Sequence, residues 1–203
     1  GRVDLPRLMK ELGKLEIDSI LLEGGGILNW SAIQSGIVQK VQAYIAPKLL
    51  GGAGATVLLD PAPAQPIRPE WLALCDYVTP NETELSLLTG MPVRGVDEAA
   101  AAARKLLDLG AKAVLNKRGA QGVLLVTREG AQLYAGFKVN AVDTTAAGDS
   151  FNGGFAVGLA RGESLENAIR LANAVGALST TAAGAQAAMP TMAAAKELMD
   201  SQR

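Results

Sequence analysis

The stretch DTTAAGDSFNGG, residues 143–154, joins small residues and a carboxylate to the start of a predicted helix. Because Ala146, Ala147 and Gly148 lead into this helix, we expect their backbone N–H groups to be unpaired and convergent, and the helix dipole adds partial positive charge. Such a cradle suits a phosphate or a developing oxyanion. Asp149 follows in the first turn, where it can accept a proton from an attacking hydroxyl. The alternative is a plain helix cap with Asp149 as a partner of the dipole.

Two other short patterns could support chemistry. In TPNETELSLLTG, which reads as a helix closed by Gly90, Asn81 and Glu84 have the spacing of a capping box at the helix N-terminus. In SILLEGGG, Gly24, Gly25 and Gly26 stand between a predicted strand and a predicted helix, which is a second place where backbone N–H groups can face an anion. A tight turn is the alternative for the three glycines.

The elements that must position these residues alternate between strand and helix patterns. Asp4 is a candidate N-cap for the first helix and Asp97 for a long alanine-rich helix that ends at Gly110. Buried strands are predicted at 19–23, 41–47, 56–60, 76–80 and 112–117, and GVLLVT after the turn GAQG is a hairpin partner. Helices are expected near 27–36, 69–75, 148–161, 164–182 and 191–200. This order predicts a three-layer α/β fold with a mostly parallel sheet flanked by helices.

Composition narrows the classes of function. The chain has 203 residues, 49% of them hydrophobic, and a net charge of −1 without a long basic run, so nucleic acid is not an expected partner. No apolar run approaches the roughly 20 residues of a membrane span, and no signal peptide is seen. The single cysteine, Cys75, lies in an apolar stretch, which indicates a buried thiol. A lone cysteine is also typical of a protein from the reducing cytoplasm. The chain has no histidine, so acid–base work falls to Asp, Glu, Lys or Tyr.

Residues 55–203 closely resemble the C-terminal half of ribokinase and its relatives in the PfkB family of carbohydrate and adenosine kinases. The matching stretches are LLDPAPAQ, TPNETELSLLTG, GAKAVLNKRGAQGV, FKVNAVDTTAAGDSFNGGFAVGLARG and ANAVGALSTTAAGAQAAMP. The resemblance implies that Asp149 is a catalytic base, that Ala146, Ala147 and Gly148 form an anion hole, and that Asn81 and Glu84 organise Mg²⁺ and phosphate.

The same resemblance implies an ATP site. Gly119 and Gly122 would line the nucleotide, and Asn173 would approach the adenine. A monovalent cation such as K⁺ would lie near Asp143 and the loop before Gly184. The chain departs from the family at Lys117 and Arg118, where Thr-Leu is frequent. A basic side chain there can still donate to phosphates, and solvated residues at a strand end are the alternative.

Residues 1–54 resemble a different family, the dihydrofolate-reductase-like reductase domain of riboflavin biosynthesis. GRVDLPRLMKELGKLEIDSILLEGGGILN and IVQKVQAYIAPKLLGG carry this likeness. In that family the triple glycine approaches the phosphates of NADPH, so Gly24 to Gly26 are candidate cofactor contacts. Reduction with NADPH rests on these glycines alone and ranks last among the hypotheses. Neither the sugar-binding motifs of the kinases nor the first strands of the reductases are seen.

The two resemblances together suggest a recombined or engineered chimera that folds as a single fused α/β domain over 1–203, with a natural fusion or a gene-prediction error as alternatives. We expect a chain that keeps the nucleotide- or phosphate-binding half of a sugar kinase without efficient catalysis. A folded chain with no retained activity and a residual ATP-dependent kinase are the alternatives. Self-association that covers an exposed sheet edge stays open.

Overall fold

The computed structural model describes residues 4–14 and 56–202. The chain divides into two compact units, Gly1–Ile45 and Ala46–Arg203. In the first unit, helix α1 (Leu5–Lys14) begins after Asp4, whose carboxylate accepts from the backbone N–H of Arg7 at 3.1 Å, as expected of an N-cap. The predicted strands at 19–23 and 41–47 and the helix at 27–36 lie outside the described residues.

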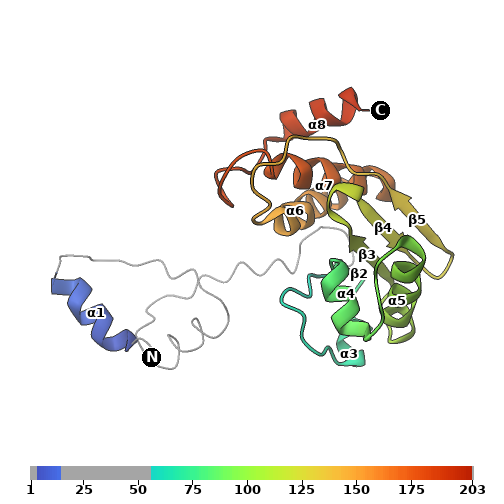
Figure 1. Cartoon of the computed structure of the whole chain (residues 1–203), viewed down its shortest axis with the longest axis horizontal. Helices are drawn as coiled ribbons and strands as arrows, with labels where there is room; N and C mark the ends of the chain where they lie inside the picture. Colours follow the sequence, from blue (N-terminus) through green and yellow to red (C-terminus); the bar gives the residue numbers. More distant parts are fainter. Residues whose placement is uncertain (1–3, 15–55, 203) are drawn as a thin grey trace. The chain divides into compact units, whose positions relative to one another are not determined.

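The second unit is built on one five-stranded mixed sheet in the order β1-β2-β3-β4-β5 (Figure 1). The first three strands are parallel, and β4 and β5 continue the sheet as antiparallel hairpins. A short 3₁₀ turn, η1 (Gly119–Gln121), joins β3 to β4, as predicted for GAQG. The strands are β1 (Leu58–Leu59), β2 (Tyr77–Val78), β3 (Ala113–Lys117), β4 (Val123–Val126) and β5 (Ala131–Tyr134).

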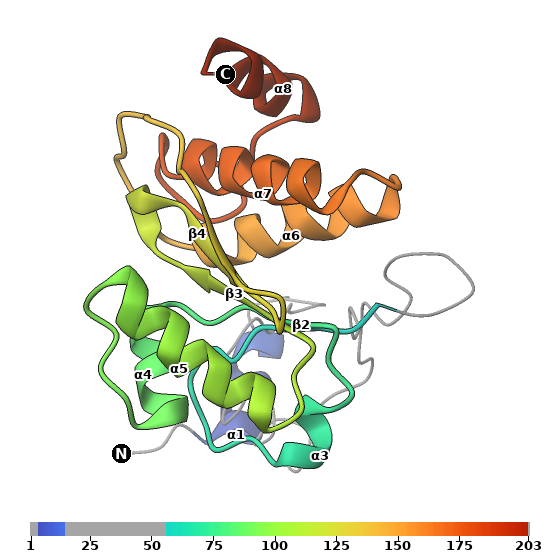
Figure 2. The same ribbon diagram turned by 90° about the vertical axis from the view of Figure 1, so that its right-hand side faces the viewer.

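Helices cover both faces of this sheet, which confirms the predicted α/β layers (Figure 2). Helices α3, α4 and α5 pack on one face, α6 and α7 on the other, and α8 packs on α7. No helix in the part of the chain that the structure describes is long and apolar enough to cross a bilayer. The helices of this unit are α3 (Pro69–Leu72), α4 (Glu82–Thr89), α5 (Val96–Asp108), α6 (Ala147–Ala160), α7 (Leu165–Ser179) and α8 (Met192–Ser201).

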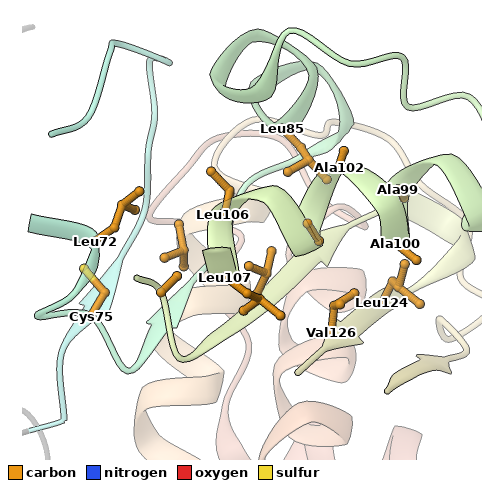
Figure 3. Packing of buried hydrophobic residues seen from close by; sticks show 14 residues of the cluster. Leu72, Cys75, Leu85, Ala99, Ala100, Ala102, Leu106, Leu107, Leu124 and Val126 are labelled. Atoms are coloured by element: carbon orange, nitrogen blue, oxygen red, sulfur yellow. The ribbon is translucent and has the colours of Figure 1, made fainter. Parts of the chain in front are cut away.

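The strand residues divide between the two faces by simple alternation. Val114 faces α4 and α5, whereas its neighbours Ala113 and Leu115 face α6 and α7. On the first face, small α5 residues such as Ala99 and Ala102 belong to the same buried cluster as the larger Leu106 (Figure 3). Burial of a leucine of this kind contributes about 1.5–3 kcal/mol.

The second face relies on two phenylalanines of α6. Phe155 is fully buried, and its ring meets the ring of Tyr77 edge-on, with centroids 5.0 Å apart. Phe151 stacks along the same helix on the Phe155 ring. Ile169 of α7 completes this cluster. The position of α6 is therefore fixed by its buried side, while its N-terminus stays at the edge of the sheet.

Local capping signals predict the start and end of α4 correctly but not the start of α5. Gly90 closes α4 with a left-handed φ of 67°, as predicted. Helix α5 begins after Gly95, so Asp97 is a first-turn residue and the prediction that it is the N-cap is wrong. Cys75 is buried as expected, and burial raises the pKa of its thiol.

Candidate phosphate-binding site

The three parallel strands bring polar residues to one edge of the sheet. Asp60 follows β1, Asn81 follows β2, and Lys117 ends β3. The backbone N–H of Lys117 donates to Pro80 O at 2.8 Å, and Asn81 and Lys117 form an isolated parallel bridge. Ligands of open α/β sheets bind outside the carboxyl ends of the strands, so this edge is a candidate site.

The N-terminus of α6 has the form predicted for an anion cradle, with one difference. Ala146 takes a left-handed conformation with φ 58°, which turns the chain into the helix. The N–H of Ala147 donates to Thr144 O at 3.2 Å, so the expectation that this amide is unpaired is wrong. Among the described residues, Ala146, Gly148 and Asp149 keep backbone N–H groups without a protein acceptor.

Lys117 is directed at this cradle. A Cβ atom added at Gly148 would lie 3.2 Å from Lys117 Nζ, so the ammonium group stands directly beside the bare glycine. The Lys117 side chain is only 13% exposed, and the alternative that it is a solvated strand-end residue is wrong. Asp149 lies in the first turn of α6 with an exposed carboxylate. Fixed positive charge and a free carboxylate therefore occur at the same helix end.

Two residues that the sequence did not single out complete the surroundings of Lys117. Asp60 accepts from Lys117 Nζ at 3.1 Å through Oδ1 and at 3.3 Å through Oδ2. Asn152 Nδ2 of α6 donates to Asp60 Oδ2 at 2.5 Å. The signal that could have found Asp60 is its place directly after a buried strand of the parallel sheet.

Arg118 was expected either to donate to phosphates or to be solvated, and the structure shows neither. The residue is 4% exposed, and its guanidinium forms an ion pair with Glu82 at 3.0 Å. It also donates to Asn116 Oδ1 at 3.3 Å and to Gln121. Arg118 thus joins the end of β3 to α4 and η1, and Lys117 is the basic side chain that points to the cradle.

Asn81 and Glu84 form the complete capping box. Asn81 Oδ1 accepts from Glu84 N at 2.8 Å, and Glu84 Oε2 accepts from Asn81 N at 2.7 Å. This fixes both side chains at the start of α4, next to the end of β3. Their role in organising Mg²⁺ stays a prediction.

Asp143 ties together the loops on either side of α6 and α7. Its Oδ1 accepts from the Thr145 hydroxyl at 2.6 Å and from Thr145 N at 2.9 Å, and its Oδ2 accepts from Gly184 N at 3.0 Å. These hydrogen bonds lower the pKa of Asp143 to about 2. The largest effect comes from the Thr145 hydroxyl, followed by the backbone amides of Gly184 and Thr145. A cation site near Asp143 stays a prediction; within the described ranges no three His, Cys, Asp or Glu residues gather as metal ligands.

The residues expected around the nucleotide have clear structural roles. Gly119 and Gly122 have positive φ values of 55° and 95°, and a Cβ at Gly122 would collide with Tyr134 O. Asn173 is buried, and its amide donates to Ala135 O at 3.2 Å and to Tyr134 O at 3.4 Å. The end of β5 is thereby held between η1 and α7. Contact of these residues with a nucleotide stays a prediction, and Gly24, Gly25 and Gly26 lie outside the described residues.

Two known families match this sequence. Residues 42–192 match the pfkB family carbohydrate kinases, and residues 2–75 match the RibD C-terminal domain. Both resemblances expected from the sequence are thus confirmed. The two matches overlap over residues 42–75, and the join expected near residue 54 falls inside this overlap.

Individual relatives agree with the longer match. The chain is 42% identical to the ribokinase of Haemophilus influenzae over 161 residues, which are 79% of this chain and 51% of the relative. It is similar to the structure of Arabidopsis thaliana ribokinase complexed with ribose and ATP, with a TM-score of 0.69 and 37% identity over 72% of this chain and 48% of that one. The Thermotoga maritima ribokinase structure gives a TM-score of 0.66 and 42% identity over 71% and 49%. The chain spans about half the length of these relatives.

Proposed function

Since this chain belongs to the pfkB family of carbohydrate kinases, we propose that the N-terminus of α6 binds the terminal phosphates of ATP. The observation that carries the proposal is the position of Lys117 Nζ beside Gly148. An ammonium group and free backbone N–H groups then lie at the same helix end, and together they would attract a phosphate more strongly than either would alone. The partner is a small-molecule nucleotide.

The groups around the cradle suit phosphoryl transfer. Asp149 would accept the proton of a substrate hydroxyl while the hydroxyl oxygen forms a bond to the γ-phosphorus and the bond to the ADP oxygen breaks. The Gly148 and Asp149 amides and Lys117 would stabilise the charge on the phosphoryl oxygens. Mg²⁺, which the Asn81–Glu84 pair would help to organise, supplies neutralisation of phosphate charge when bound. A K⁺ ion near Asp143 would support the loop that precedes the cradle.

We infer binding without efficient sugar phosphorylation. Lys117, Asn81 and Glu84 have proposed roles toward phosphate and Mg²⁺, and a hydroxyl that is not held close to Asp149 reacts slowly because positioning accounts for many orders of magnitude in rate. Residual kinase activity and a folded chain without a ligand are the outcomes that a direct test must separate.

Binding is tested by titrating the full chain with Mg·ATP, followed by calorimetry and by the fluorescence of Trp30 and Trp71; Trp71 is 52% exposed and lines the same cavity of about 230 Å³ as Asp60. Gly148→Leu should abolish binding because its side chain would displace Lys117 Nζ. Gly153→Leu is the matched control, since a Cβ at Gly153 meets nothing within 4 Å. Absence of any heat or fluorescence change at millimolar ATP would reject the proposal.

Turnover is tested separately by coupled detection of ADP with ribose as acceptor. We expect a rate at the level of the background without ribose. A ribose-dependent rate that disappears in Asp149→Asn would instead identify the chain as a working kinase with Asp149 as its base.

A further inference from the structure

Asp60 makes one contact pattern that the proposed phosphate site does not explain by itself. It is the first residue after β1, and it meets side chains from two distant segments, Lys117 at the end of β3 and Asn152 in α6. The Asp60 side chain is 25% exposed and the Lys117 side chain 13% exposed, so solvent screens this pair less than it would at the open surface. One carboxylate therefore joins the end of the sheet to the helix that forms the cradle.

The geometry leaves Lys117 able to bind a ligand while it is paired. Its ammonium group has three donors, and Asp60 accepts from it at 3.1 and 3.3 Å. The same group lies 3.2 Å from a Cβ built on Gly148, so a donor remains for a ligand at the cradle. A lysine side chain is long and loses much rotamer freedom when it is fixed. With the carboxylate in place, that freedom is already lost before a ligand arrives.

We propose that Asp60, itself oriented by Asn152, is a positioning residue that holds Lys117 Nζ over Gly148 for a phosphate group of the nucleotide. This inference rests on the proposed function, because it assigns a role to Asp60 only if the cradle binds phosphate. Asp60 acts through Lys117, and removing Asp60 should therefore cause no loss of binding when Lys117 is absent.

A matching ion pair at the other end of the sheet provides the control. Asp76 precedes β2 and bonds Lys112, which precedes β3, at 2.7 Å, and the Asp76 side chain is also 25% exposed. Its lysine is 63% exposed, and Asp76 also accepts from Val57 N at 2.7 Å, so removing that carboxylate removes a more exposed Lys–Asp pair and one backbone contact without touching the cradle. Asp76→Ala should leave the affinity for Mg·ATP unchanged.

The test is a double-mutant cycle on Mg·ATP affinity, measured by calorimetry on the full chain. Asp60→Ala should weaken binding by about three- to tenfold, which is the effect of ordering one long side chain on binding. Lys117→Met should weaken binding further, and adding Asp60→Ala to Lys117→Met should cause no further loss.

Asp60→Asn should keep the affinity within about twofold, because an amide oxygen can still accept from Lys117. Its NH₂ group can donate to Asn152 Oδ1 once the Asn152 amide turns over, and in the unaltered chain that oxygen is buried without a hydrogen-bond partner among the described residues. This rescue separates a positioning role from a general need for charge at this place.

The possible results distinguish failure of this inference from failure of the proposed function. Losses in Asp60→Ala and Lys117→Met that simply add, or tighter binding in Asp60→Ala through relief of repulsion with phosphate, would overturn this inference while ATP binding stands. No binding by the unaltered chain would reject the proposed function itself. Circular dichroism and thermal melting check folding, and Asn152→Ala replaces Asp60→Ala in the cycle if the latter does not fold.

Discussion

Asp143 is a single carboxylate that fixes the loop leading into the cradle. Three donors from Thr145 and Gly184 lower its pKa to about 2 from the ordinary 3.8. Because the folded state binds this proton less readily than the unfolded state, the stabilisation is complete above the unfolded pKa and is lost as the pH falls toward 2. The loop after α7 therefore depends on an ionised Asp143.

Asp143→Asn should lower the free energy of unfolding at neutral pH, because the amide group places an N–H donor against another donor. The difference between the two proteins should be constant from pH 7 to about 5 and shrink as the pH falls from about 4 to about 2. Urea unfolding at several pH values measures this.

Thr145→Val, which removes the leading donor, should raise the pKa of Asp143 in a carboxyl NMR titration. An unchanged pKa would mean that the Thr145 hydroxyl is not the main cause of the shift.

The sequence predicted the roles of some of these residues and not of others. Asn81, Glu84 and Gly90 were predictable because capping depends on neighbours a few positions away. The contact between Asp60 and Lys117 spans 57 positions and depends on strand order, which a local pattern does not contain. Arg118 and Lys117 are adjacent at the end of a strand, so their side chains leave on opposite faces, and only packing decides which one meets the cradle.

At the scale of elements, α6 and α7 approach closely because α6 carries glycines on its inner side. A Cβ at Gly158 would lie 2.7 Å from Ala168 Cα, and one at Gly154 would lie 3.0 Å from the side chain of Val175. The sequence predicted helices near 148–161 and 164–182, and the structure shows Ser164 as the N-cap of α7. Their close approach follows from the missing side chains.

Gly158→Ala should destabilise the protein by about 1–3 kcal/mol, because the added methyl group forces α6 away from α7. Gly153→Ala in the same helix is the control and should stabilise it by about 0.5–1 kcal/mol, since its Cβ meets nothing and alanine is the better helix former. Urea unfolding gives both values. Equal effects of the two substitutions would show that the helices do not rely on this contact.

At the scale of the whole molecule, the second unit contains its own core. The three hydrophobic clusters of the described residues draw on residues from Leu58 onward, and the cradle, Lys117 and Asp60 belong to the same unit. The sequence predicted the α/β class of this unit well, because strands and helices alternate along it. The expected single domain over 1–203 stays a prediction.

A chain of residues 46–203 should therefore unfold cooperatively in urea and bind Mg·ATP with the affinity of the full chain. The physical reason is that every described residue of the three clusters lies at Leu58 or beyond, inside this shorter chain. Parallel calorimetry and urea titrations of both chains measure this, with light scattering at several concentrations to detect self-association. Loss of cooperative unfolding would mean that the first unit contributes to the core of the second.

The left-handed conformation of Ala146 bears on the rate at which a ligand would bind the cradle. An L-residue in this conformation costs about 1–2 kcal/mol, and this cost is met when the chain folds. The amides of the cradle are consequently preorganised, and under the proposed function a nucleotide would meet a loop that needs no rearrangement. The association rate would then be set by diffusion and charge, and variation in affinity among variants of this cradle would lie mainly in the rate of release.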